Sequence, residues 1–335
     1  MKSPMHAAAC LRKWLWHILF AAGVAGIAGA AFAADNYPSR PVRLIVPYAA
    51  GGNADLVGRI VAEGLTTRMG VQFIVDNRPG ASSIIGTELA VKAPPDGYTI
   101  VLIASTFAVN PSLVAKLPYD SLRDLAPISL VAQTPQVLVA SPAVPVKSLK
   151  DLIALAKAKP GTLNYGSTGV GSSANMAGAL LNVLAGIQLV HVPYKGTAQL
   201  LTETIAGHLH LAIPSVTSSN AFIRSGKVRA LGVTSSTRSA QFPELPTIAE
   251  AGVPGYQTVI WNAIVAPRAT PPAIIDRLSR ELAAAMRAPE AADRYRGLGA
   301  ETIGSTPAEL AKFLRSEIEQ YARVIRETGL KTELR

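Results

Sequence analysis

The stretch VPYAAGGNADLVGRI, residues 46–60, joins an apolar strand to a helical pattern through a turn with almost no side chains. Gly51 and Gly52 leave the backbone amides at the helix start unshielded, and these amides carry a partial positive charge. A plain turn with a cap from Asn53 or Asp55 is the favoured interpretation for this stretch alone. The alternative is a binding site for a small anion. If the Asp55 carboxylate points into that site, its charge argues against anion binding. If it instead holds the turn in place, it is compatible with anion binding.

A second loop repeats this arrangement. NYGSTGVGSSAN, residues 164–175, has three glycines and four Ser or Thr residues before an Ala- and Leu-rich helix. Its Gly169-x-Gly171-x-x-Ala174 spacing is similar to a dinucleotide fingerprint, but the next strand offers no acid for a ribose. No Gly-Lys-Ser/Thr follows, so it is not a P-loop. Free amides and hydroxyls suit a small carboxylate, and two such loops in one chain favour anion binding at both.

Strand-like and helix-like segments alternate along the chain, which predicts two α/β halves, each with a mainly parallel sheet flanked by helices. Ligands of such sheets bind beyond the C-terminal ends of the strands, where both loops lie. Ser148 with Asp151 and Thr306 with Glu309 predict capping boxes at two helix starts. The predicted strands are residues 42–48, 71–77, 98–104, 136–142, a short one from about 163, 187–194, 228–235 and 264–267. The predicted helices are 54–69, 85–92, 148–161, one that ends at about 185, 198–207, one from about 272 and one from 307.

The first 33 residues have the layout of a secretory signal peptide. They carry three positive charges, no acidic residue, an apolar stretch from Trp14 to Ala31, and a small-x-small cleavage pattern that ends at Ala33. An uncleaved membrane anchor is the alternative, but the segment is rich in Ala and Gly and slightly short, since spanning needs roughly 20 apolar residues. Cys10 precedes the apolar core, where a lipid-anchor cysteine would not be. We expect cleavage after Ala33 and export as a soluble protein.

The composition of the remaining chain argues against several classes of function. Three of the 32 Lys and Arg residues lie in the first 33 residues, which leaves 29 against 22 Asp and Glu, a formal charge of +7. The positive residues are scattered, and both signs alternate in the C-terminal segment, so we expect no nucleic-acid binding. No cysteine remains, so ordinary burial must stabilise the fold. About 300 residues suggest two domains.

Catalytic and metal-binding patterns are weak. The histidines after residue 33 are His191, His208 and His210, and no Cys or acidic cluster completes a metal site with them. An exported serine-type hydrolase using Ser172 or Ser173 with His191 is the enzymatic alternative. It lacks a Gly-x-Ser-x-Gly elbow and an orienting acid. We therefore expect no catalytic residue, no metal and no cofactor.

Five segments resemble one family in their order and spacing. The chain after residue 33 is similar to the tripartite tricarboxylate transporter substrate-binding (Bug-type) proteins over essentially its whole length. The first loop and PPDGYT are the most specific signals. The segments are YPSRPVRLIVPYAAGGNADLVGRI (37–60), VDNRPGASSIIGTELAVKAPPDGYTIVL (75–102), LNYGSTGVGSS (163–173), VHVPYKGTAQLLTETIAG (190–207) and LPTIAEAGVPGY (245–256).

The resemblance implies a type II periplasmic binding protein fold, with two α/β lobes joined by two crossing strands and a ligand cleft between them. Lobe 1 would comprise residues 34–134 and 258–335, and lobe 2 residues 135–257. A small carboxylate would be held largely by backbone amides and ordered waters. Carried over by position, the ligand contacts would be Tyr48, Ala49, Gly51, Gly52, Asp55, Ser105 and Thr106 in lobe 1, and Ser167, Thr168, Gly171, Ser172, Ser173 and Thr197 in lobe 2.

The implied function is capture of a small organic carboxylate in the periplasm and its delivery to a membrane transporter, by a monomer that closes on its ligand. A carboxylate sensor with a signalling partner is the alternative. Two positions depart from the family: Asn175 stands where members often have His, and Pro214 stands where they often have Asp. The missing acidic group argues against a ligand with an ammonium. Trp261 is either a core residue or a cleft wall, with the core favoured.

Overall fold

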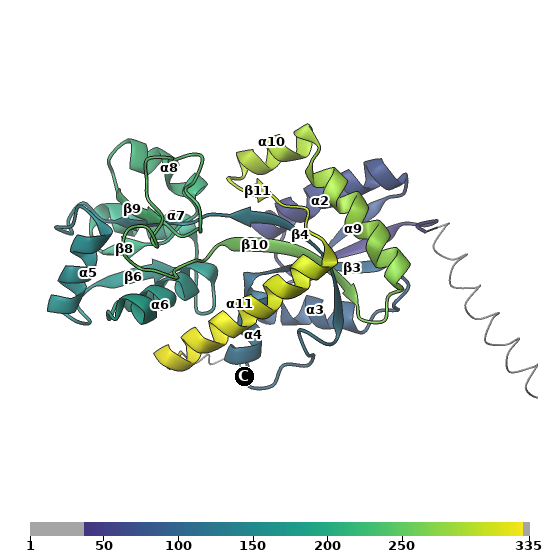
Figure 1. Cartoon of the computed structure of the whole chain (residues 1–335), viewed down its shortest axis with the longest axis horizontal. Helices are drawn as coiled ribbons and strands as arrows, with labels where there is room; N and C mark the ends of the chain where they lie inside the picture. The colour runs from purple at the N-terminus through teal and green to yellow at the C-terminus, as the bar shows by residue number, and fades with distance from the viewer. Residues whose placement is uncertain (1–36, 331–335) are drawn as a thin grey trace, which may run out of the picture.

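Two mixed β-sheets, each flanked by helices, form two lobes that lie side by side (Figure 1). The computed structural model describes residues 37–330. The predicted signal peptide, residues 1–33, lies outside the described residues. The arrangement confirms the predicted α/β fold with two lobes.

The first lobe contains a six-stranded sheet in the order β11-β4-β10-β3-β1-β2. β1 pairs in parallel with β2 and β3, and β10 lies antiparallel between β3 and β4. Four strands thus share one direction, whereas β10 and the short edge strand β11 run the opposite way; β10 is reversed because it brings the chain back from the second lobe. The strands are β1 (Val42–Val46), β2 (Phe73–Asn77), β3 (Thr99–Ala104), β4 (Leu125–Thr134), β10 (Ile260–Pro267) and β11 (Glu301–Thr302).

The second lobe contains a five-stranded sheet in the order β7-β6-β8-β5-β9. β6 is parallel to β7 and β8, and β5 is antiparallel to both of its neighbours. Four strands again share one direction, but both sheets are mixed: four of the nine strand pairings are parallel and five are antiparallel, so parallel pairing is less frequent than the sequence predicted. The strands are β5 (Val137–Ala140), β6 (Asn164–Ser167), β7 (Val190–Pro193), β8 (Leu211–Ala212) and β9 (Arg229–Val233).

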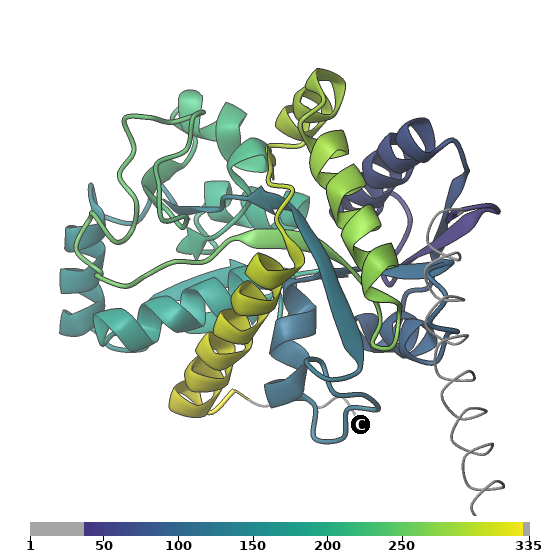
Figure 2. The ribbon, with the colours of Figure 1, turned by 45° about the vertical axis from the view of Figure 1, so that its right-hand side comes forward.

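Helices cover the sheets of both lobes (Figures 1 and 2). Those of the first lobe are α2 (Asn53–Met69), the short 3₁₀ helix η1 (Ala81–Ser83), α3 (Ile84–Val91), α4 (Ser105–Leu113), α9 (Pro272–Met286), α10 (Pro289–Gly297) and α11 (Pro307–Thr328). Those of the second lobe are α5 (Leu149–Ala158), α6 (Ser173–Ala185), α7 (Thr197–Ala206) and α8 (Val216–Arg224). Both predicted capping boxes are present, at Ser148 before α5 and at Thr306 before α11.

Two chain crossings connect the lobes. β4 leads into β5 through residues 135–136, and the chain returns through residues 257–259 into β10, which pairs with β4 over most of its length. Trp261 on β10 is fully buried and packs edge-on against Phe313 of α11, which confirms it as a core residue. α11 packs on α4 of the first lobe and α6 of the second, behind the crossing strands. The crossing region is therefore covered by one long helix.

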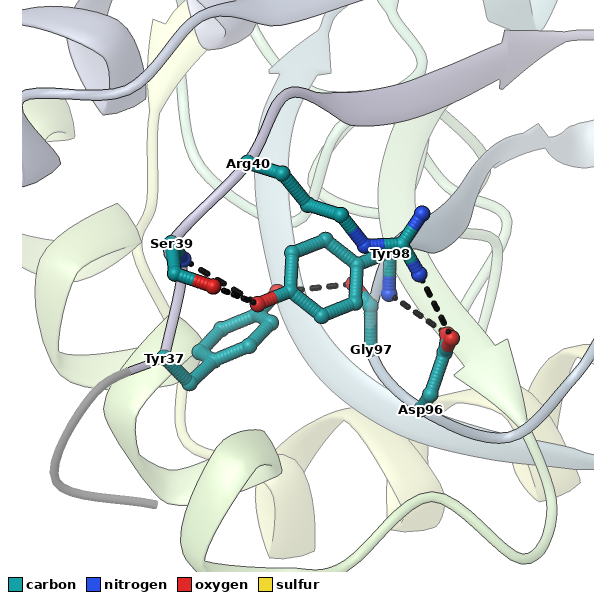
Figure 3. Close-up of polar contacts among 6 residues, drawn as sticks. All are labelled: Tyr37, Ser39, Arg40, Asp96, Gly97 and Tyr98. Atoms are coloured by element: carbon teal, nitrogen blue, oxygen red, sulfur yellow. Dashed lines mark hydrogen bonds and ion pairs between the residues drawn. The ribbon is translucent and has the colours of Figure 1, made fainter. Parts of the chain in front are cut away.

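The PPDGYT segment holds the start of the described chain against the first lobe (Figure 3). The Tyr37 hydroxyl donates to the Gly97 carbonyl at 2.7 Å. Arg40 pairs with Asp96 at 3.0 Å and lies over the Tyr98 ring, 4.1 Å from its centroid. This specific motif therefore has a structural role.

Candidate functional site

A cavity of about 430 Å³ lies between the lobes and is lined by residues of both. Its volume is in the range of small-molecule pockets. Among the described residues that line it, none is charged. The first lobe contributes Tyr48, Ala49, Gly52, Asn53, Ala54, Ala104, Ser105, Thr106, Ile260 and Asn262; the second contributes Thr168, Ser172, Ser173, Ala174, Thr197, Leu200, Ile213, Pro214 and Ser215; and Gln136 lies on the connection.

Five helix N-termini meet at this cavity. α2 and α4 reach it from the first lobe, and α6, α7 and α8 from the second, each through its N-cap or first-turn residues. The N-cap residues of α2, α4 and α7 are Gly52, Ala104 and Gly196, and none of them makes a side-chain cap. Unpartnered amides and roughly half a positive charge at each helix start make the cavity favourable for an anion without any cationic side chain.

Asp55 holds the first loop in place and does not cap α2. Its carboxylate accepts hydrogen bonds from the Gly51 amide at 2.8 Å, from Asn77 Nδ2 at 3.0 Å and from Arg59 Nε at 3.0 Å. Burial alone would raise the pKa of Asp55, but the hydrogen bonds from Arg59, Gly51 and Asn77 lower it below its ordinary value. Of the two roles considered for Asp55, the structure shows the one that fixes the turn. The expected side-chain cap at this helix start is absent.

On the other wall of the first lobe, Tyr48 and Thr106 share a hydrogen bond of 2.7 Å between their hydroxyl oxygens. Burial raises the pKa of Tyr48, so its phenol is neutral. The Ser105 hydroxyl accepts a hydrogen bond from the backbone amide of Trp261 at 3.3 Å, which links α4 to the crossing strand β10. These contacts fix the polar side chains that follow β1 and β3.

The second loop is fixed by Ser172 and Asn175. Ser172 Oγ caps α6 by accepting from the Asn175 amide at 3.3 Å, and it donates to the Gly169 carbonyl at 2.8 Å. Asn175 is fully buried; its Oδ1 accepts from the Gly171 amide at 3.0 Å and its Nδ2 lies 3.1 Å from the Tyr165 hydroxyl. Asn175 therefore shapes the loop from beneath instead of facing the cavity.

Nine of the thirteen predicted site residues line the cavity, and four do not. Gly51 and Asp55 form the hydrogen bond behind the first loop. Ser167 is fully buried, and Gly171 faces Val109 and Leu113 of α4 across the lobes. The nine are Tyr48, Ala49, Gly52, Ser105, Thr106, Thr168, Ser172, Ser173 and Thr197.

Sequence reasoning missed the residues that the crossing segments contribute. Asn262 on β10 is 1% exposed, and its Nδ2 has no hydrogen-bond partner among the described residues. Gln136 is 2% exposed; its Nε2 donates to the Ile213 carbonyl at 2.8 Å, whereas its Oε1 has no partner there. A polar residue inside the apolar run VIWNAIVAP was the available signal. Unsatisfied buried polar atoms in a cavity wall are expected where a ligand supplies the partner.

The three histidines of the described residues, His191, His208 and His210, lie outside the cavity lining. His191 Nε2 is 2.6 Å from Ser167 Oγ, a residue that the hydrolase hypothesis did not name, and burial lowers the pKa of His191. His208 pairs with Glu203, and His210 contacts Asn164. Within residues 37–330, no group of three His, Cys, Asp or Glu side chains could hold a metal ion. No helix in the same range is long and apolar enough to cross a membrane.

Comparison with known proteins identifies the family. The family described as "Tripartite tricarboxylate transporter family receptor" matches residues 57–330. The chain belongs to this receptor family. The receptor is 38% identical over 309 residues to the protein BugT of Bordetella pertussis, covering 92% of this chain and 94% of that one. It is also 39% identical over 297 residues, 88% of each chain, to a protein encoded in the tcbD-tcbE intergenic region of Pseudomonas sp. strain P51.

Solved structures of similar proteins share the fold. The receptor is similar to R. palustris Rpa4515 with adipate, at 34% identity and a TM-score of 0.75, over 88% of this chain and 99% of that one. It is similar to MatC from Rhodopseudomonas palustris with bound malate, at 28% identity and a TM-score of 0.72, over 86% and 100% of the two chains. The periplasmic binding protein BugD is 33% identical, with a TM-score of 0.72, over 88% and 99%. The receptor therefore has the fold of the periplasmic binding proteins of this family.

Proposed function

We propose that the chain is exported to the periplasm after cleavage of residues 1–33, captures a small organic carboxylate between its two lobes, and delivers it to a membrane transporter. The observation that carries this proposal is the meeting of five helix N-termini around a cavity without charged lining residues. The lobes are residues 34–134 with 258–335, and residues 135–257. The chain acts as a monomer without a cofactor.

Several features favour a carboxylate over other solutes. A cation would meet five positive helix ends and no carboxylate in the lining. A neutral solute would leave the unpartnered amides of α2, α4 and α7 without an acceptor. The similar proteins Rpa4515 and MatC hold adipate and malate, which are both carboxylates of a size that fits about 430 Å³.

The binding mechanism follows from the placement of the two loops. Gly52 and Ser105 stand in the first lobe, and Ser173 and Thr197 stand in the second. One ligand touches all four only when the lobes are close, so it stabilises the closed arrangement by its additional contacts there. Asn262 Nδ2 donates to the ligand from the floor of the cleft. Binding thereby produces the closed form that a transporter or a sensor partner would recognise.

We propose no catalytic activity for this site. His191 hydrogen-bonds to Ser167 outside the cavity lining, and Ser172 caps α6 with the oxygen that a nucleophile would need. No carboxylate among the described residues is hydrogen-bonded to His191, so the orienting group of a triad is lacking.

Thermal unfolding of the exported chain with a panel of acids tests the proposal. The panel pairs acetate, malate, adipate, citrate and benzoate with neutral analogues such as adipamide. A ligand at 100 times its Kd stabilises the folded state by about 2.7 kcal/mol, so a binder raises the melting temperature measurably. We expect at least one carboxylate to do so and its neutral analogue to fail. Equal shifts with carboxylate and amide, or no shift with any carboxylate, would contradict the anion site.

A further inference from the structure

Gly299 and Thr217 make a direct contact between the lobes, beside the crossing strands. Gly299 lies in the short link between α10 and β11, and Thr217 lies in the first turn of α8. A Cβ at position 299 would lie 1.3 Å from Thr217 Oγ1 and 2.6 Å from Thr217 Cβ. Figure 1 shows the link between α10 and β11 reaching toward the second lobe.

Only glycine fits this contact for two separate reasons. Gly299 has a φ of +68°, which side chains disfavour, and the space that a Cβ would occupy is filled by Thr217. The second reason can be isolated, because Gly70 has a nearly identical φ of +69° with nothing within 4 Å of its Cβ position. Gly70 ends α2 in the same lobe and does not line the cavity.

Thr217 forms the contact with Gly299, but burial of its hydroxyl group makes the contact less favourable. Its Oγ1 is buried and has no hydrogen-bond partner within residues 37–330. A hydroxyl buried without a partner loses its hydrogen bonds to water and costs free energy. Moving the lobes apart at this point would return the hydroxyl to water. The unpartnered hydroxyl therefore weakens the contact between the lobes without abolishing it.

The contact lies close to the ligand cavity. Thr217 follows Ser215, the N-cap of α8, by two residues, and Ser215 lines the cavity. The backbone amide of Val216 donates to the Pro135 carbonyl at 3.1 Å, so the start of α8 is tied to the first crossing segment. Any shift of α8 away from the first lobe would therefore change the distance between Ser215 and the lining residues of α2 and α4.

We propose that Gly299 and Thr217 set the ligand affinity by controlling how closely α8 approaches the first lobe. The proposal rests on the carboxylate-binding function proposed above. Gly299 allows the approach because it has no side chain, and the unpartnered Thr217 hydroxyl weakens it. Both are positioning residues, since neither lines the cavity.

Four variants of the exported chain test this proposal, with the affinity measured by calorimetry for whichever acid of the panel binds best. Gly299→Ala should raise Kd at least about 10-fold, because the new methyl holds the lobes apart. Gly70→Ala should leave Kd within about 2-fold. Thr217→Ala should lower Kd several-fold, because it removes the buried hydroxyl and places no larger atom against Gly299. Gly299→Ala with Thr217→Gly should recover most of the lost affinity, since Thr217 is the obstacle.

A measurement without ligand separates this proposal from the proposed function. Small-angle scattering should give Gly299→Ala a larger radius of gyration than wild type and Gly70→Ala the wild-type value. If no acid binds wild type, the proposed function loses its support, whereas the scattering comparison still tests the interlobe contact. Wild-type scattering and affinity in Gly299→Ala, equal loss in Gly299→Ala and Gly70→Ala, or weaker binding by Thr217→Ala would overturn the proposal.

Discussion

The carboxylate of Asp55 accepts a hydrogen bond from the backbone amide of Gly51, four residues earlier, at 2.8 Å. The same carboxylate binds Asn77 of β2 and Arg59 of α2, and it is 2% exposed. One side chain thus ties the glycine turn to a strand and a helix. The turn presents its amides to the cavity because Asp55 holds it from behind.

Asp55→Ala should destabilise the protein by about 2–4 kcal/mol, because it leaves the Gly51 amide and Asn77 without their buried acceptor. It should also abolish ligand binding, since the loop loses its fixed conformation. Asp293→Ala is the control: Asp293 pairs with Arg296 on the surface, 68% exposed, so its loss should cost at most about 0.5 kcal/mol. Urea denaturation measures the free energy of unfolding of both variants. Equal, small effects would show that the Asp55 hydrogen bonds do not hold the loop.

Gly52→Val should abolish ligand binding while the protein stays folded. Gly52 has φ −79° and ψ 169°, which any residue adopts, and a Cβ there would meet only the Ala49 carbonyl oxygen, at 3.4 Å. The valine side chain would occupy the cavity and shield the amides of α2. We expect at least about a 100-fold rise in Kd and a change in stability below about 1 kcal/mol. Gly52→Ala should weaken binding less. Unchanged affinity in the valine variant would show that residues 46–60 form only a turn and do not bind the ligand.

Asn262→Leu should have opposite effects on stability and binding. Its Nδ2 is buried and has no partner among residues 37–330, so replacing the amide by an apolar group of similar size removes an unsatisfied donor. We expect unchanged or slightly higher stability, by up to about 1 kcal/mol, and about 10-fold weaker carboxylate binding. Asn262→Asp should weaken binding further, because it places a negative charge on the cleft floor. Unaltered affinity in Asn262→Leu would exclude Asn262 as a ligand donor.

The two glycine loops could be predicted because their signal is local. Adjacent glycines between an apolar strand and a helix define the turn. The capping boxes are likewise predicted by two residues three positions apart, Ser148 with Asp151 and Thr306 with Glu309. α4 could not be found this way, because it begins at Ser105 directly after β3 with no turn residue between them.

The cleft floor depends on tertiary structure. On β10, Asn262 faces the cleft and its neighbour Trp261 faces α11. An apolar run carries no pattern that predicts which face of the strand lines a cavity. The pairing of His191 with Ser167 likewise depends on β6 and β7 lying side by side. Such contacts arise from strand order, which a single sequence does not encode locally.

Glu317 should make the stability depend on pH near neutrality. Its Oε2 accepts a hydrogen bond from Trp261 Nε1 at 2.7 Å, and burial raises the pKa of Glu317 to about 7, partly offset by Trp261 and Tyr321. A carboxyl whose pKa is higher in the folded state binds more protons there. Protonation of Glu317 therefore stabilises the folded state. This stabilisation is fully present below the ordinary glutamate pKa and is lost as the pH rises through about 7.

Glu317→Gln should remove this dependence, because glutamine accepts the Trp261 hydrogen bond without ionising. At pH 8 the variant should be more stable than wild type by about 1–2 kcal/mol, less than the full pKa shift implies because Glu317 is partly exposed. Trp261 is the only tryptophan after residue 33, so in protein produced from residue 34 onward its fluorescence reports on this pair. Wild-type emission should titrate near pH 7, and Glu317→Gln should not. Glu319→Gln, on the exposed face of α11, should titrate like wild type. A titration that persists in Glu317→Gln would assign it to another group.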